Sequence, residues 1–77
     1  MELQTPEQQQ SPQKFELNAI RKGFFVRLRD ESGSFLWAMV RGRQGDVFFG
    51  LVEHSYPDGP ARGSRIAFTK YNVYEVT

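Results

Sequence analysis

The segment from Phe24 to Val52 constrains the fold most, because apolar and polar side chains alternate along it in three short runs. The runs cover residues 24–29, 35–41 and 47–52. Two turn-forming stretches separate them, Asp30–Gly33 and Gly42–Gly45. A period of two bounded by glycine and aspartate is typical of a meandering antiparallel sheet. The pattern predicts an all-β fold, and it contains no motif for a particular chemistry.

The rest of the chain extends this pattern by two strands. Residues 53–64 form the longest connection, and its Tyr56–Pro60 stretch is a strong turn signal. We expect a fourth strand over 65–68, a tight turn over 69–72 and a last strand over 73–76. Five short strands with these connections predict a small SH3-like barrel. An OB-fold is disfavoured because no helix is expected between the third and fourth strands.

The first 13 residues differ in composition from the rest. They are rich in glutamine and contain two prolines and few aliphatic side chains. Such a segment buries too little apolar surface to offset the entropy of ordering it. We therefore expect residues 1–13 to be a disordered tail and residues 14–77 to be the barrel domain.

Size and composition exclude several classes of protein. A chain of 77 residues is long enough for one domain with a small core, and its eleven aromatic residues suit such a core. It contains no cysteine, so a disulfide framework and a thiol nucleophile are excluded. Its net charge of +1 is far from that of a dedicated nucleic-acid binder. No apolar run is long enough to span a membrane. We expect a cytoplasmic protein, either a monomer or a weak homodimer.

The sequence favours no catalytic, metal or cofactor site. His54 is the sole histidine, and a zinc site needs three or more converging ligands. No serine lies in a nucleophile-elbow motif. Asp30 and Glu31 are adjacent at a predicted hairpin tip, where we expect both carboxylates to be solvated. We therefore predict that the protein is not an enzyme.

Arginine and aromatic side chains share one face of the first strands, and they form the candidate binding site. Its predicted members are Phe25, Arg27, Arg29, Trp37, Arg41, Arg43 and Phe48. In one alternative this face is exposed to a partner. In the other, the apolar residues of the lead-in segment, Phe15, Leu17 and Ile20, fold back over Trp37 and Phe35. The covered alternative is favoured, since the lead-in segment needs a place for its apolar side chains.

Two functions fit an exposed arginine and aromatic face. The favoured one is a non-catalytic binding module that engages a protein partner through aromatic anchors. The alternative is a nucleic-acid-binding accessory protein, with arginines and Lys70 on phosphate and Trp37 or Phe48 stacking on bases. A small enzyme is a distant third.

Five short segments resemble a known family of bacterial proteins. They are Phe25–Leu28, Leu36–Val40, Gly50–Val52, Gly63–Phe68 and Asn72–Tyr74. Together they resemble the small YegJ-like domain of unknown function, over about residues 24–76. The chain departs from that pattern at Ser64, where the family tends to have aspartate, and at Tyr74–Glu75, where it tends to have Asp-Trp. The resemblance implies a fold and a bacterial or mobile-element origin, and no site residues.

Overall fold

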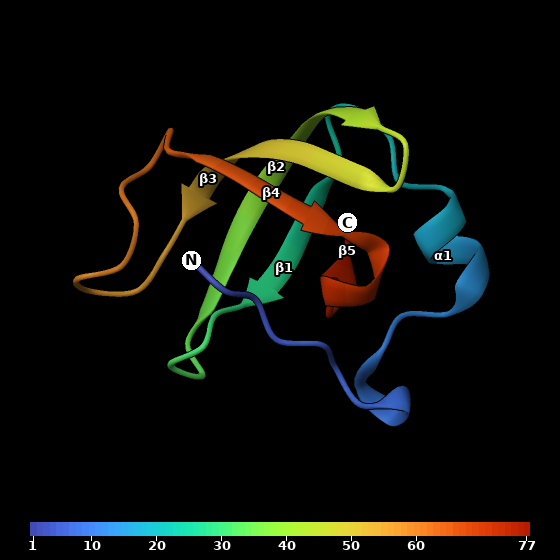
Figure 1. Ribbon diagram of the computed structural model, residues 1–77, viewed down its shortest axis with the longest axis horizontal. Coiled ribbons are helices and arrows are strands. Elements are labelled where there is room, and N and C mark those ends of the chain that lie inside the picture. The colour runs from blue at the N-terminus through green and yellow to red at the C-terminus, as the bar shows by residue number, and fades with distance from the viewer.

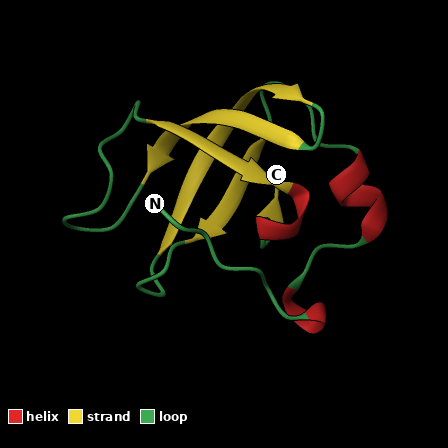
Figure 2. Cartoon of the chain, viewed as in Figure 1, coloured by secondary structure: helices red, strands yellow, loops and turns green.

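The alternating segments form strands with one buried and one outer side. The computed structural model describes all 77 residues, which form a five-stranded antiparallel sheet in the order β4-β3-β2-β1-β5 (Figure 1). The strands are β1 (Phe25–Arg29), β2 (Phe35–Gln44), β3 (Val47–His54), β4 (Arg65–Thr69) and β5 (Glu75–Val76). The helical elements are short: η1 (Gln8–Gln10), α1 (Lys14–Asn18) and η2 (Lys70–Asn72) (Figure 2). None of the helices is long and apolar enough to cross a membrane.

The core lies on the inner side of the curved sheet. Each strand from β1 to β4 contributes buried side chains to it, and Ile20 and Val73 join from outside the sheet. The full cluster is Ile20, Val26, Leu28, Leu36, Ala38, Val40, Phe48, Val52, Phe68 and Val73. The first turn also follows the sequence prediction, because Gly33 has a φ of +87° that side chains other than glycine resist.

The sheet stays open, so the prediction of a closed SH3-like barrel is wrong. β4 pairs with β3 alone, and β5 pairs with β1 alone. β5 contains only two residues, and η2 separates it from β4. A strand this short offers too few backbone groups to form a ladder on both sides, and a barrel needs such ladders all round.

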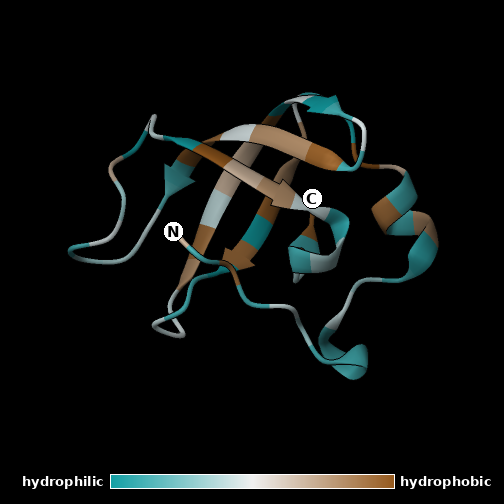
Figure 3. Cartoon of the chain, viewed as in Figure 1, coloured by the Kyte–Doolittle hydropathy of each residue, from teal (hydrophilic) through white to brown (hydrophobic).

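Residues 1–13 are ordered, so the prediction of a disordered tail is also wrong. Leu3 forms a β-bridge with Asp30, and the amide of Gln4 donates to the carbonyl of Arg29 at 2.8 Å. Pro6 is buried, while η1 is exposed and hydrophilic (Figure 3). Amino-acid composition did not predict the ordering of this segment, because backbone pairing to a free strand edge needs few apolar side chains.

The lead-in segment packs against the core and leaves the Trp37 side of the sheet uncovered. Ile20 is buried in the core, and Leu17 packs against it. Phe15 remains 68% exposed. The favoured alternative, in which these side chains cover Trp37 and Phe35, is therefore wrong. The lead-in segment buries Ile20 and Leu17 against the core instead.

Candidate functional site

The side of the sheet opposite the core, here called the outer face, carries a row of apolar side chains. Phe25 pairs with Met39, Met39 with Leu51, and Leu51 with Arg65. Directly paired residues of antiparallel strands project to the same side. The row therefore runs from β1 across β2 and β3, and it ends in an arginine on β4.

Trp37 lies in the next row of the outer face. It pairs with Arg27 on one side and with His54 on the other, and it is partly exposed. Leu17 and Ile20 of the lead-in segment pack against the core and not over this row, and α1 lies at the end of the core (Figure 2). Trp37 is thus available at the surface as an aromatic contact.

Phe35 organises the arginines of β1. The guanidinium carbons of Arg27 and Arg29 lie 4.4 and 5.2 Å from the centre of its ring. Tyr74 packs edge-on against the same ring, with centroids 5.2 Å apart and planes at 87°. Cation–π contact and ring packing therefore hold these two arginines close to the sheet.

Both arginines are also engaged by polar groups of the protein itself. Nε of Arg27 lies 3.5 Å from Oε1 of Glu75, an ion pair whose geometry falls short of a hydrogen bond. The Nε–H of Arg29 donates to the carbonyl of Gly33 at 2.9 Å. These contacts give Arg27 and Arg29 structural roles and reduce the charge that they offer to a partner.

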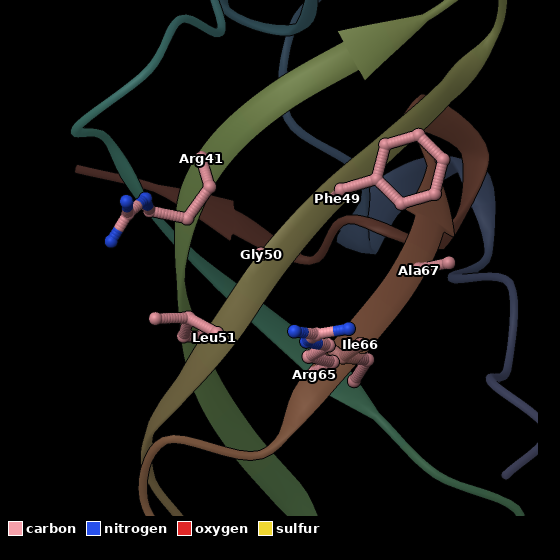
Figure 4. Close-up of a pocket in the computed structure, with 7 residues that line it drawn as sticks. All are labelled: Arg41, Phe49, Gly50, Leu51, Arg65, Ile66 and Ala67. Carbon is pink, nitrogen blue, oxygen red and sulfur yellow. The ribbon is translucent and has the colours of Figure 1, made fainter.

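Arg41 and Arg65 differ, because both are exposed and neither forms an ion pair. The two ion pairs of the structure are Arg27–Glu75 and Arg62–Glu53. Arg41 and Arg65 come from β2 and β4, on either side of β3 (Figure 4). They border a shallow depression of about 580 Å³. Its lining is Arg41, Phe49, Gly50, Leu51, Arg65, Ile66 and Ala67.

Phe48 and Arg43 lie away from the outer face, which corrects their predicted place. Phe48 is 3% exposed in the core, where its ring stacks on Phe68 with centroids 5.5 Å apart. A register shift between Val40 and Gly42 inserts Arg41 as an extra residue. The bulge reverses the alternation beyond it. Arg43 therefore lies opposite Phe48, with its guanidinium carbon 5.2 Å from the ring centre.

The structure thus divides the predicted site. Phe25, Trp37 and Arg41 are together on the outer face, where Arg27 and Arg29 are also present but internally engaged. Sequence reasoning missed Phe49 and Arg65. Phe49 is 42% exposed and could have been found from its alternation with the buried Gly50 and Phe48.

Asp30 is buried, so the prediction that it is solvated is wrong. Its side chain is 3% exposed and accepts hydrogen bonds from the amides of Ser32 at 2.9 Å and Ser34 at 3.3 Å. The hydroxyl of Tyr56 also donates to it. Burial acts to raise the pKa of Asp30, but the hydrogen bonds from Ser32, Tyr56 and these amides outweigh it, and the pKa falls below its ordinary value.

The same contact affects Tyr56. Its hydrogen bond to the Asp30 carboxylate raises the pKa of the phenol, and burial acts in the same direction. The pair joins the β1–β2 hairpin to the long 53–64 connection, which is a structural task. No cluster of three or more His, Asp or Glu side chains is placed to hold a metal ion.

No family model, curated protein or solved structure matches this chain. The resemblance to the YegJ-like domain therefore stays a prediction.

Proposed function

We propose that the protein is a non-catalytic binding module that engages a protein partner through its outer face. The observation that supports this most is the row of half-buried side chains formed by Phe25, Met39 and Leu51 beside the exposed Phe49. The chain orders both its N-terminal segment and its lead-in helix, yet it uses neither to cover this row. Contiguous exposed apolar surface with a polar rim is the usual composition of an interaction site.

The charges beside the row favour an acidic protein surface as the partner. Arg41 and Arg65 have no carboxylate of their own within ion-pair distance. Arginine pairs with carboxylates through its planar fork and is enriched at the energetic centres of interfaces. An apolar centre with two unpaired arginines therefore suits a partner that presents apolar residues flanked by Asp or Glu.

A nucleic acid fits the same face less well. The centre of the row is aliphatic, at Met39 and Leu51, whereas single strands bind mainly by stacking on flat rings. Glu75 and Glu53 pair with Arg27 and Arg62, which leaves fewer free cations to contact the many charges of a phosphate backbone. Cytoplasmic action remains part of the proposal, and the cysteine-free composition is compatible with it.

Paired substitutions on the outer face test this function. Arg41→Glu combined with Phe49→Ala removes one free arginine and one exposed ring without touching β4. Lys22→Glu combined with Phe15→Ala makes the same chemical changes at exposed positions outside the face. Protein capture from a bacterial lysate should fall at least about tenfold with the first pair relative to the wild type, since aromatic and arginine anchors dominate interfaces. It should be unchanged with the second pair.

Equal capture by both variants would contradict the proposal. A single-stranded DNA of about 20 nucleotides tests the alternative partner directly. Tight binding to it, weakening steeply as salt rises, would indicate a nucleic-acid binder instead, because each phosphate contact releases counterions. Melting temperatures of both variants control for folding.

A further inference from the structure

One edge of the sheet is already occupied by the chain itself. Along the outer edge of β1, Phe25 exchanges backbone hydrogen bonds with Thr77, and the carbonyl of Arg27 accepts from Tyr74. The N-terminal segment continues the same edge, where the carbonyl of Arg29 accepts from Gln4. This edge therefore has little capacity left to pair with another chain.

The other edge, along β4, is open. The amide of Val52 donates to Ser64, which sets the alternation of the β3–β4 ladder. In an antiparallel ladder, the backbone groups of alternate residues face the partner strand. Ile66 therefore faces β3, while the N–H and C=O groups of Arg65 and Ala67 face away from it. No hydrogen bond outside the ladder involves the backbone of Arg65 or Ala67.

Hollows lie on both sides of this open edge. On the outer side is the depression of about 580 Å³ bordered by Arg65 (Figure 4). On the inner side is a second cavity of about 200 Å³. Its lining is Met1, Val52, Pro60, Arg65, Ile66 and Ala67, so both hollows share the three central residues of the edge.

From this arrangement we infer that an extended segment of a protein partner binds as an added sixth strand, antiparallel to β4. The backbone of the segment would pair with the outward groups of Arg65 and Ala67. Its side chains would alternate between the two hollows, because successive residues of a strand point to opposite sides. The inference rests on the proposed function and specifies how the partner binds.

The two hollows differ in chemistry, which defines the segment. The outer one presents the unpaired Arg65, so acidic side chains suit that side. The inner one is lined by Val52, Pro60 and Ile66, so apolar side chains suit it. A second copy of this chain fits less well, since its own β4 would place a further arginine, and no carboxylate, on the outer side. The segment should therefore alternate acidic and apolar residues.

A capped heptapeptide of alternating valine and glutamate tests the inference with the full-length protein. In the antiparallel pairing, glutamate lies opposite Ala67 and its amide points to β4, whereas the valine amides point to solvent. Methylating the glutamate nitrogens should weaken binding at least about tenfold, since backbone hydrogen bonds give strand addition its affinity. Methylating the valine nitrogens should leave binding unchanged. The two peptides thus form a matched pair.

Nuclear magnetic resonance reads out the site of binding. On addition of the parent peptide, the amides of Arg65 and Ala67 should become protected from hydrogen exchange. The Arg65→Glu variant should no longer bind the valine–glutamate peptide, because its outer side repels carboxylates. It should instead bind a peptide of alternating valine and lysine. Absence of binding up to about 1 mM peptide, or equal binding of both methylated peptides, would overturn strand addition.

The outcomes separate this inference from the proposed function. If the peptides do not bind but protein capture still depends on Arg41 and Phe49, strand addition is wrong. The outer face then binds a partner in another way. If the peptide binds at β4 but Arg41→Glu with Phe49→Ala captures normally, strand addition stands and the outer-face proposal is wrong. Protection of Ala67 that rises with protein concentration in the absence of peptide would mean that a second copy occupies the edge, which would also overturn the inference.

Discussion

Gly50 shows how a single residue sets the spacing of two central strands. A Cβ atom built at this position would lie 2.5 Å from the backbone oxygen of Met39, which is too close for any side chain. β2 and β3 therefore approach each other here in a way that only glycine permits. The outer-face row passes beside this point, because Met39 pairs with Leu51.

We expect Gly50→Ala to destabilise the protein by about 1–3 kcal/mol, since the strands must move apart to admit the methyl group. Gly42→Ala is the matched control on the facing strand, where an added Cβ would meet nothing within 4 Å. It should change stability by no more than about 0.5 kcal/mol. Urea denaturation of the two variants measures the difference. Equal stabilities would show that β2 and β3 are not in close contact at Gly50.

Asp30 joins three segments of the chain, and its charge is needed for that. It bonds the hairpin turn through Ser32 and the long connection through Tyr56, and its backbone pairs with Leu3. Asp30→Asn should reduce the free energy of unfolding at pH 7 by about 1.5–3 kcal/mol, the range for hydrogen bonds to charged groups. Glu31→Gln removes the same charge from the exposed neighbouring residue and should have little effect.

The lowered pKa of Asp30 predicts how this difference varies with pH. A carboxyl whose pKa is lower in the folded state stabilises the fold at pH values above its ordinary pKa of 3.8. That stability is lost as pH falls through the folded pKa. The difference in the free energy of unfolding between wild type and Asp30→Asn should therefore be constant from about pH 7 to 5 and should decrease below about pH 4. A gap that persists unchanged to pH 2 would contradict the ionised role of Asp30.

At the scale of elements, the N-terminal segment behaves as part of the sheet edge. Leu3 packs against the core, Pro6 is buried, and Gln4 bonds to both Arg29 and Asn72. Deleting residues 1–13 should cost about 2–4 kcal/mol, from lost apolar burial and backbone hydrogen bonds. For a domain of this size, that corresponds to a fall in melting temperature of more than about 10 °C.

A control variant isolates the contribution of pairing from that of chain length. Changing the three exposed glutamines of η1 to serine keeps the segment in place and should shift stability by no more than about 0.5 kcal/mol. If deletion of residues 1–13 leaves the melting temperature unchanged, the segment does not dock on β1.

The elements that sequence predicted well are those defined by local patterns. Period-two alternation located β1 to β4, and Gly33 marked a turn that does require positive φ. The errors arose where distant segments decide the outcome. The place of Ile20, the buried Asp30 and the open β4 edge each depend on contacts between residues far apart in the chain. A local pattern of alternation cannot predict contacts of that kind.

Only part of the candidate site was predicted, because sequence alternation is local. Phe25, Trp37 and Arg41 follow simple alternation and were placed correctly on the outer face. The bulge at Arg41 reverses the pattern, so Arg43 was misplaced. Arg65 was not predicted, because its cross-strand neighbour Leu51 precedes the long 53–64 connection and Arg65 follows it. Local alternation does not show that two such distant residues pair.

In the whole molecule, the outer face is left accessible to solvent and is flanked by the unpaired Arg41 and Arg65. Trp37 is the sole tryptophan, so its fluorescence reports on this face without interference. It pairs with Arg27 across the sheet, and Arg41 lies on the same strand and face. Nearby cations attract anions from solution.

Collisional quenching of Trp37 by iodide and by caesium, at matched ionic strength, measures both the exposure of this face and the charge beside it. We expect measurable quenching by both ions, with iodide the more effective, and a smaller preference for iodide in Arg41→Glu. Lys22→Glu, which lies outside the face, should keep the wild-type preference. If neither ion quenches the tryptophan, another part of the protein covers the outer face, and that face is not available to a partner.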